Sequence, residues 1–272
     1  MIPAALRYQR ASSVDDALAA LAEHGDDAKL LAGGHSLLPL MKLRLAAPEI
    51  VVDIGGLREL AGVRDDGDAV VLGALARHHD LSRDSLLSEH VPLLAHVAGV
   101  IGDPQVRHRG TVGGSVVHGD PAADLPAALL ACDAEFVLRG PSGQRRVAAT
   151  EFFAGPFTTA CEPDELLTEI RVPKHTGLGW GFEKFTRRSI DWAVVGVAVC
   201  DRAVALINMS GTPLRAGVTE RALADGAPIA EAAKLADEGT SPADEPHATT
   251  AYRRHLARVL TERTLLQADR LG

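Results

Sequence analysis

The chain has few of the residues that form metal centres, disulfides or nucleic-acid surfaces. Its 272 residues include only three cysteines, and aromatic residues make up 4%. Since no Cys-x-x-Cys pair is present, the sequence indicates neither a disulfide framework nor an iron–sulfur site. The scarcity of aromatic residues argues against a stacking surface for single-stranded nucleic acid. We expect Cys132, Cys161 and Cys200 to be small buried apolar residues.

Basic segments and long apolar segments are also missing. The formal net charge is −8 and no Lys/Arg-rich block occurs, which argues against nucleic acid or an anionic membrane as a partner. The first ten residues contain no apolar signal core. The longest apolar stretch, residues 193–200, is too short to span a bilayer. These features predict a cytoplasmic protein without a transmembrane segment, long enough for one large domain or two to three small ones.

Periodicity and turn signals divide the chain into three α+β units. Ser13 and Asp16 resemble a capping box before a helix that ends at Gly25. Apolar patterns predict further elements. Expected strands are residues 29–31, 50–54, 69–73, 135–138, 182–186 and 193–200, the last pairing with 202–209 as a hairpin. Expected helices are residues 37–43, 91–100, 122–132, 229–238 and 249–267.

Two double-glycine segments carry the candidate chemistry. Gly33 and Gly34 lie between an expected strand and helix, and Gly113 and Gly114 form an expected turn about eighty residues later. Adjacent glycines permit positive φ and close approach of another molecule. Their successive N–H groups can form an anion-binding concavity, which a following helix reinforces. One such segment is most simply a tight turn, whereas two predict a paired site for one diphosphate. Neither is a Walker P-loop or a G-x-G-x-x-G fingerprint.

Two acidic residues precede or begin the helix expected over residues 122–132. An acidic residue at such a position is ordinarily a cap, and Asp120 is the better candidate for that role. Asp124 has a second interpretation, because acidic residues in other nucleotide-binding folds accept hydrogen bonds from sugar hydroxyls. Both interpretations of Asp124 stay open on the residues alone.

These motifs together resemble a known family, the FAD-binding medium subunits of xanthine dehydrogenases and carbon monoxide dehydrogenases. The carbon monoxide dehydrogenase medium subunit is the most similar type. The resemblance rests on Ala32-Gly33-Gly34-His35-Ser36, on Thr111-Val112-Gly113-Gly114-Ser115 and on Asp120-Pro121-x-x-Asp124. It continues in residues 37–44, 101–107, 183–193 and 213–216, so it covers nearly the whole chain.

The resemblance implies an α+β fold and a non-covalent FAD. Residues 1–176 would form a two-part FAD-binding domain of the vanillyl-alcohol-oxidase/p-cresol-methylhydroxylase type, split near residue 57. Residues 177–272 would form a C-terminal α+β domain. The implied cofactor contacts are Ala32, Gly33, Gly34, His35, Ser36, Ile101, Thr111, Val112, Gly113, Gly114, Ser115, Asp124 and Trp192. No catalytic residue and no metal ligand is implied in this chain.

The family also implies a role for each part of this set. Both glycine segments would hold the FAD pyrophosphate through backbone N–H groups, and Asp124 would contact the FAD. Ile101 would lie near the flavin or its ribityl chain. Trp192 would lie beside the isoalloxazine ring, although an isolated tryptophan is as well explained as a core residue. The side chains of His35 and His118 have no assigned role.

By the same resemblance, the chain is an oxidoreductase subunit that relays electrons. They would pass from the [2Fe–2S] clusters of a small subunit through FAD to a quinone, NAD or oxygen. A large molybdenum subunit would choose the substrate, and two three-subunit units would form a dimer. A self-contained flavin oxidase is the main alternative, but only about ninety-five residues follow the FAD region. A non-catalytic nucleotide-binding module is a second alternative.

Overall fold

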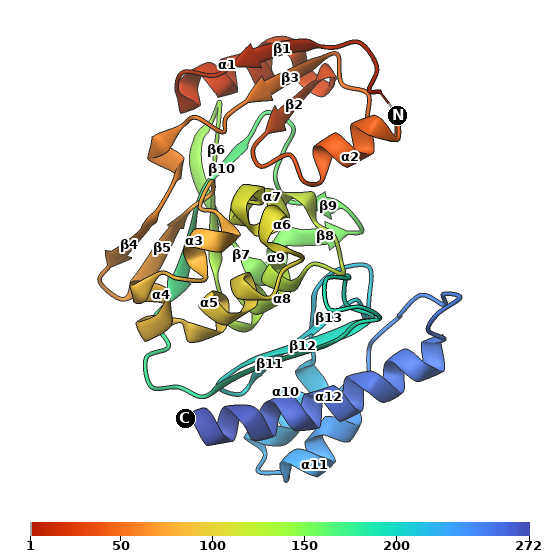
Figure 1. The fold of residues 1–272 in the computed structure, drawn as a ribbon. Helices are drawn as coiled ribbons and strands as arrows, with labels where there is room; N and C mark the ends of the chain where they lie inside the picture. Colours follow the sequence, from red (N-terminus) through yellow and green to blue (C-terminus); the bar gives the residue numbers. More distant parts are fainter. Residues whose placement is uncertain (1) are drawn as a thin grey trace.

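Residues 2–272 form three sheets of three or more strands that are stacked along the molecule, each with helices packed against it (Figure 1). The computed structural model describes residues 2–272. The first sheet is parallel, with strand order β1-β3-β2. Its elements follow the chain as β1 (Arg7–Arg10), α1 (Val14–His24), β2 (Ala28–Leu31), α2 (Leu37–Lys42) and β3 (Ile50–Asp53).

The start of α1 shows how the local sequence sets an element boundary. Ser13 Oγ accepts a hydrogen bond from the Asp16 backbone N–H at 3.1 Å. Asp16 Oδ2 in turn accepts from the backbone N–H of Ser12 at 2.8 Å, one residue before the cap. Gly25 follows the helix with a φ of 51°. The helix expected between Ser13 and Gly25 is therefore confirmed, with the reciprocal bond of its capping box shifted to Ser12.

The second sheet is antiparallel and has the order β4-β5-β10-β6-β7. Its strands are β4 (Val63–Asp66), β5 (Ala69–Gly73), β6 (Glu135–Gly140), β7 (Gly143–Ala148) and β10 (Leu166–Pro173). The helices of this region are α3 (His78–Leu81), α4 (Ser85–His90), α5 (Pro92–Gly99), α6 (Pro104–Arg109), α7 (Val112–His118), α8 (Asp124–Ala131) and α9 (Ala149–Phe152). A hairpin of β8 (Phe153–Gly155) and β9 (Thr158–Thr159) completes it.

The third sheet lies between two layers of helices. Its strands, in order, are β11 (Trp180–Phe185), β12 (Val195–Cys200), β13 (Ala203–Ile207) and β14 (Leu214–Arg215). The helix α12 (Thr250–Leu271) runs along one face, while α8 and α5 lie on the other (Figure 1). Short helices α10 (Gly217–Ala224) and α11 (Ile229–Ala232) lie beside α12.

Strand β12 is buried on both faces, which explains its continuous apolar run. Val195, Val197 and Val199 belong to the core that includes residues of α12. Ala198 and Cys200 point to the opposite side and join the core around α5 and α8. The same sheet therefore joins the C-terminal elements to the middle of the molecule.

The α+β class expected from the sequence is confirmed, as is the hairpin of β12 and β13. Two expectations need correction, and several elements, among them the central strand β10 and the helix α10, have no counterpart among the expected ones. The helix expected over residues 229–238 ends at Ala232 and continues only as a 3-10 turn over Ala233–Leu235. The glycine turn expected at residues 111–115 is instead the beginning of α7.

The correction at α7 has a packing cause. Thr111 Oγ1 accepts from the Gly114 N–H at 3.2 Å and caps the helix. A Cβ atom on Gly113 would lie 2.7 Å from both Cβ and the carbonyl oxygen of Ala74. This glycine is therefore needed because α7 packs closely on the segment after β5, and not because the chain turns there.

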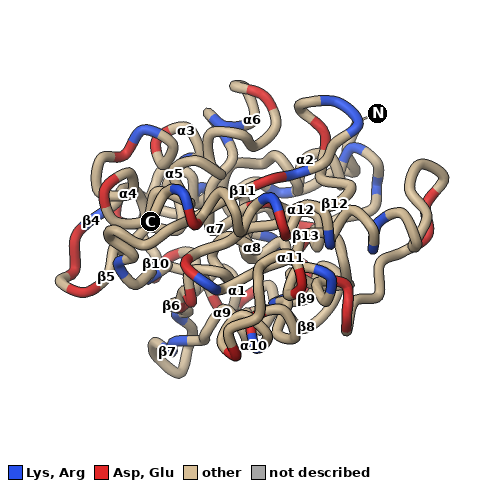
Figure 2. The backbone as a smooth tube through the Cα atoms, turned by 90° about the horizontal axis from the view of Figure 1, so that it is seen from below, with Lys and Arg blue, Asp and Glu red and all other residues tan. Residues whose placement is uncertain are grey.

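Charged residues of both signs are distributed over the whole molecule (Figure 2). Among residues 2–272, no helix combines the length and the apolarity needed to cross a bilayer.

Candidate cofactor site

A cavity of about 700 Å³ lies where the three regions of the chain meet. Cofactor pockets in proteins commonly enclose about 300–1,000 Å³. The walls come from the β2–α2 loop, the starts of α7 and α8, strand β11 and the loop after it. Twelve of the residues expected to contact a cofactor line it: Ala32, Gly33, Gly34, His35, Ser36, Ile101, Thr111, Gly113, Gly114, Ser115, Asp124 and Trp192.

Val112 is the expected contact that the structure does not bring to the cavity. Its side chain is fully buried in the core. Its backbone N–H donates to Ala76 O at 3.0 Å, so neither the side chain nor the N–H group is free to contact a ligand.

The β2–α2 loop presents free hydrogen-bond donors. The backbone N–H groups of residues 33–36 donate to no protein acceptor within the part of the chain that the structure describes. Gly34 has a φ of 81°, a conformation that glycine adopts without strain. Consecutive unpaired N–H groups beside a cavity form the kind of concavity that binds an anion. The expectation made for this segment therefore agrees with its geometry.

The second glycine segment is different, and the expectation of a second set of free N–H groups is wrong. The Gly113 N–H donates to Ala74 O at 2.9 Å, and the Gly114 N–H donates to Thr111 Oγ1 at 3.2 Å. The Ser115 N–H donates to Thr111 O at 3.1 Å. Gly113 and Gly114 line the cavity, but their lack of a side chain serves packing. A Cβ on Gly113 would meet Ala74, and a Cβ on Gly114 would lie 2.8 Å from Thr111 Oγ1.

The first glycine segment packs directly on the end of α6, just before the second glycine segment. A Cβ atom on Gly33 would overlap the carbonyl oxygen of Arg109, which ends α6. Arg77 donates a hydrogen bond to the same oxygen. One residue later, Gly110 lies against the ring of His78 and accepts from its backbone N–H at 3.2 Å. Glycine at position 33 therefore permits the two walls of the cavity to meet.

His78 is a buried polar group behind this contact, with 4% of its surface exposed. Burial lowers the pKa of its imidazole to about 4, with further lowering by nearby cationic groups. The ring is therefore neutral at physiological pH. Its Nδ1 is buried and, among the described residues, has no hydrogen-bond partner. This nitrogen is a free polar group beside the cavity.

Asp124 forms an almost fully buried ion pair with Lys184 across the cavity wall. Lys184 Nζ lies 2.7 Å from Asp124 Oδ2, and the two side chains are 10% and 7% exposed. Lys184 also donates to Val100 O at 3.3 Å. Burial raises the pKa of the Asp124 carboxyl, and the ammonium of Lys184 opposes this shift. The second oxygen, Oδ1, is buried and has no partner in residues 2–272, and Asp124 lines the cavity.

Asp120 is not the cap of α8, contrary to the sequence-based expectation. The residue preceding the helix is Ala123, which makes no side-chain capping bond. Asp120 Oδ1 instead accepts from the Ala122 N–H at 2.9 Å and closes the turn before it.

The remaining wall residues form a turn that is held by hydrogen bonds and an exposed rim. Arg107 Nη1 donates to Ile101 O at 3.0 Å and to Gly102 O at 3.1 Å, and so holds the Ile101–Gly102 turn at the cavity. Trp192 is 61% exposed at the rim, so it is not the core residue of the alternative interpretation.

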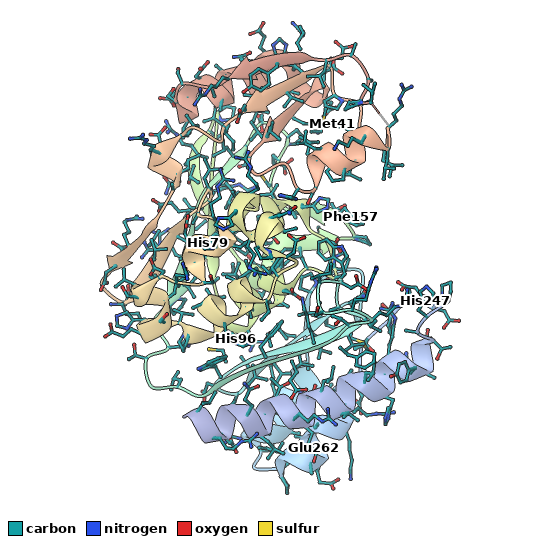
Figure 3. All side chains as sticks on the ribbon, viewed as in Figure 1. Met41, His79, His96, Phe157, His247 and Glu262 are labelled. Atoms are coloured by element: carbon teal, nitrogen blue, oxygen red, sulfur yellow. The ribbon has the colours of Figure 1, made fainter. Side chains whose placement is uncertain are left out.

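The two histidines at the cavity differ in exposure. The side chain of His35 is exposed, whereas that of His118 is partly buried, and this burial lowers its pKa. The His118 ring contacts that of Phe157, which lies between β8 and β9 and is labelled in Figure 3, with centroids 5.2 Å apart.

Sequence reasoning missed Lys184 and His78 as wall residues. Lys184 is two residues from buried Phe182 on one strand, so both side chains lie on the same inward face. A lysine that faces inward requires a buried carboxylate partner. The position of Lys184 in the apolar pattern of its strand therefore indicates such a pair from the sequence alone. His78 gives no comparable signal. Cys161 is half-buried and lines the cavity, so the expectation that all three cysteines are buried is wrong for this one.

Comparison with known proteins assigns both parts of the chain to families. Residues 4–175 match the family described as FAD binding domain in molybdopterin dehydrogenase. Residues 180–268 match the CO dehydrogenase flavoprotein C-terminal domain. The carbon monoxide dehydrogenase medium chain of Hydrogenophaga pseudoflava is 42% identical, over 97% of this chain and 97% of that one. The 6-hydroxypseudooxynicotine dehydrogenase complex subunit alpha of Paenarthrobacter nicotinovorans is 37% identical, over 98% and 96%.

A solved structure agrees with this similarity. It is the carbon monoxide dehydrogenase from Hydrogenophaga pseudoflava that lacks the Mo-pyranopterin moiety of the molybdenum cofactor. A chain of it superposes on this one with a TM-score of 0.96 and 43% sequence identity, and the match covers 100% of both chains.

Proposed function

The chain belongs to the FAD-binding subunits of the molybdenum hydroxylases, which are oxidoreductases, and we propose that it is the electron relay of a carbon monoxide dehydrogenase-like complex. The proposed route runs from the [2Fe–2S] clusters of a small subunit through FAD to an external acceptor. Substrate oxidation would take place on a large molybdenum subunit. Similarity to carbon monoxide dehydrogenase medium chains over nearly the full length supports carbon monoxide as the substrate of the complex.

FAD supplies the electron-accepting and electron-donating chemistry when it is bound, and the residues of this chain bind and orient it. We propose that the N–H groups of residues 33–36 donate to the pyrophosphate. Gly113, Gly114 and Ser115 would line the cavity beside it. Asp124 Oδ1 would accept a hydrogen bond from a hydroxyl of the cofactor, Ile101 would lie near the ribityl chain, and Trp192 would lie beside the isoalloxazine ring.

One observation carries this assignment. A single cavity has four free backbone donors at one wall and, at another, an unpaired carboxylate oxygen whose partner oxygen binds Lys184. Donors suit a diphosphate, and a buried acceptor suits a sugar or ribityl hydroxyl. A dinucleotide carries both kinds of group, so the residues present fit FAD.

Domain organisation and assembly are part of the proposal. We propose residues 1–176 as the FAD-binding part, divided near residue 57, and residues 177–272 as the C-terminal part. Exposed apolar side chains at the cavity rim, Ile190 at 55% and Trp192 at 61%, support a covering partner. The proposed assembly is a cytoplasmic dimer of heterotrimers with the iron–sulfur and molybdenum subunits.

A comparison of the isolated chain with the complete complex tests the relay. The chain alone, loaded with FAD, is expected to reduce no dye when supplied with carbon monoxide, a purine, an N-heterocycle or an aldehyde. Its flavin should still be reduced by dithionite, and the complete complex should reduce the dye with its substrate. Substrate-dependent dye reduction by the isolated chain would instead identify a self-contained flavin oxidase or reductase.

A further inference from the structure

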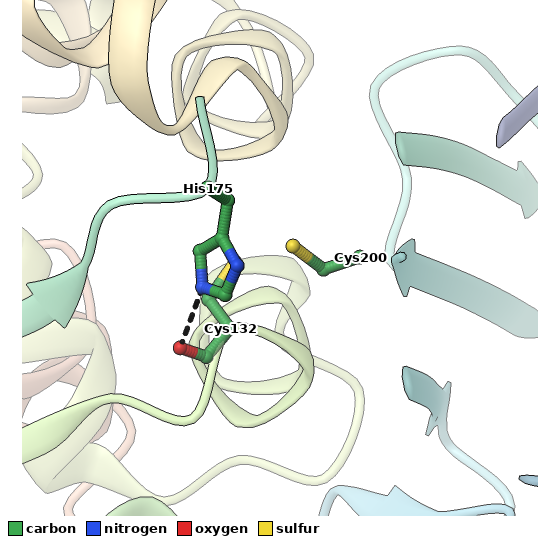
Figure 4. Close-up of side chains that lie close together, drawn as sticks. All are labelled: Cys132, His175 and Cys200. Atoms are coloured by element: carbon green, nitrogen blue, oxygen red, sulfur yellow. Dashed lines mark hydrogen bonds between the residues drawn. The ribbon is translucent and has the colours of Figure 1, made fainter. Parts of the chain in front are cut away.

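Three side chains that do not belong to the cofactor site lie close together at the end of α8. Cys132 directly follows α8, His175 comes two residues after β10, and Cys200 is the last residue of β12. One ligand atom from each, the two sulfurs and an imidazole nitrogen, all lie within 4.8 Å of one another. Figure 4 shows the His175 imidazole in front of Cys132, with the Cys200 thiol pointing toward them. No spacing in the sequence indicates this group, because its members come from three different elements.

The surroundings hold the three residues in place. His175 Nε2 lies 3.1 Å from Cys132 O, and the other ring nitrogen lies on the side of Cys200 (Figure 4). The His175 backbone N–H donates to His90 O at 2.8 Å. Cys132 is fully buried and Cys200 is 4% exposed. The cluster is therefore built into the protein and is not a chance meeting of mobile surface side chains.

The cluster lies at the junction between the two family-matched parts of the chain. Cys132 and His175 fall within residues 4–175, and Cys200 falls within residues 180–268. Nearby, His96 of α5 (labelled in Figure 3) contacts Trp180 of β11 with ring centroids 5.3 Å apart. An ion held by all three ligands would therefore bridge the FAD-binding part and the C-terminal part.

We propose that Cys132, His175 and Cys200 bind one thiophilic cation, Zn²⁺, which joins the two parts of the chain. Two thiolates and one imidazole form a donor set that zinc accepts in proteins. Zinc–sulfur bonds of about 2.3 Å and zinc–nitrogen bonds of about 2.0 Å require ligand atoms roughly 3.5–3.8 Å apart in a tetrahedral site. The separations between the ligand atoms, all within 4.8 Å, need to shorten by about 1.0–1.3 Å at most, which small changes in side-chain torsion angles supply. A water molecule would complete the coordination.

Zinc binding replaces the two thiol protons by the metal ion and needs no oxidant. Each thiol releases its proton to solvent as its sulfur–zinc bond forms, and the imidazole binds through a neutral nitrogen lone pair. The site is separate from the electron relay, since none of its three residues lines the cofactor cavity. Its effect is on the stability of the junction, because a ligand that binds only the folded chain stabilises it.

Metal analysis of the purified complex, expressed with added zinc, tests the proposal. The wild type is expected to contain one zinc per copy of this chain. Cys161→Ser is the matched control, because Cys161 lies outside the cluster, and it should retain the zinc. Cys200→Ser and His175→Ala should lose it while keeping their FAD content, which shows that the variants are folded.

A second measurement uses only the wild type and does not depend on the folding of a variant. Removal of zinc by a chelator should lower the Tm, and added Zn²⁺ should restore it. Cobalt substitution should give a thiolate-to-cobalt charge-transfer band in the difference spectrum. Zinc content that is equal in the wild type and in Cys200→Ser overturns the proposal. It is also overturned if the cluster holds another metal, or if mass spectrometry finds a Cys132–Cys200 disulfide in its place.

Discussion

Lys184 Nζ lies 2.7 Å from Asp124 Oδ2 and joins strand β11 of the third sheet to the first turn of α8 in the middle region. The pair is nearly buried, so neither charge is screened effectively by water. One oxygen of Asp124 binds the lysine, and the other is buried without a partner among the described residues. The pair thus connects the packing of the two regions with the proposed binding of FAD.

Removing one partner of this pair should lower the stability of the fold more than removing both. We expect Lys184→Met to lower the free energy of unfolding by about 3–5 kcal/mol, because it leaves a buried carboxylate without its cation. The double variant Asp124→Leu/Lys184→Met should recover most of that loss. Urea unfolding of the three proteins measures the difference. Equal losses in the single and double variants would contradict the account of the pair.

The same double variant should bind FAD poorly although it is folded. Losing a hydrogen bond to a charged group costs about 1.5–3 kcal/mol, which corresponds to roughly 10–150-fold weaker binding. Lys234→Gln is the control, since Lys234 pairs with Glu231 on the surface. Fluorescence titration of FAD-stripped protein gives the dissociation constants. Unchanged affinity in the double variant would remove Asp124 from the FAD site.

A valine at position 33 should abolish FAD binding. Its Cβ would overlap Arg109 O, so the β2–α2 loop would have to separate from the end of α6 and the donors of residues 33–36 would be displaced. Gly155→Val is the control, because the nearest atom to a Cβ there is 3.8 Å away. Flavin content of the two purified variants is the measurement. Normal flavin content in Gly33→Val would show that the contact of the β2–α2 loop with the end of α6 does not form the site.

The free energy of unfolding should fall as the pH falls from 6.5 to 4, the range in which the His78 imidazole is protonated in the unfolded chain but neutral in the folded one. Its folded pKa is about 4, below the ordinary 6.5, so the unfolded state binds the extra proton between these values. The contribution is fully present above pH 6.5 and is lost towards pH 4, by at most about 3 kcal/mol. His78→Gln should show a flatter pH dependence in urea unfolding at a fixed excess of FAD. Identical slopes for both proteins would contradict the buried neutral imidazole.

The cofactor should be recoverable intact. Heat or acid denaturation of the purified complex is expected to release one FAD per copy of this chain, since the free donors suit a diphosphate. Chromatography of the supernatant identifies the flavin. Recovery of FMN, or flavin that remains with the polypeptide, would be inconsistent with the proposed site.

Local sequence signals predicted some elements well and failed where tertiary contacts decide. The cap at Ser13 and the apolar run of β12 are signals within a few residues, and both elements are as expected. Gly113 and Gly114 also give a local signal, for a turn, but the cap at Thr111 and the close approach to Ala74 favour a helix. At the first glycine segment the N–H groups meet no competing protein acceptor among the described residues, so its predicted role as an anion-binding loop stays a prediction.

Parts of the site depend on contacts that a single sequence does not contain. The approach of Gly33 to Arg109 joins segments far apart in the chain. The partner of Asp124, Lys184, lies sixty residues away. The cluster of Cys132, His175 and Cys200 requires α8, β10 and β12 to end at one place. The number and order of cofactor-lining motifs could be predicted, but these pairings could not.

Acceptor reduction by an FAD-free complex tests the relay most directly. The complex is assembled with Gly33→Val, its assembly is checked by size-exclusion chromatography, and a substrate that reduces the clusters of the wild type is added. We predict that the clusters are reduced in both complexes, while the external acceptor is reduced only by the wild type. An FAD-free complex that reduces the acceptor at the wild-type rate would contradict the proposal that electrons leave through this chain.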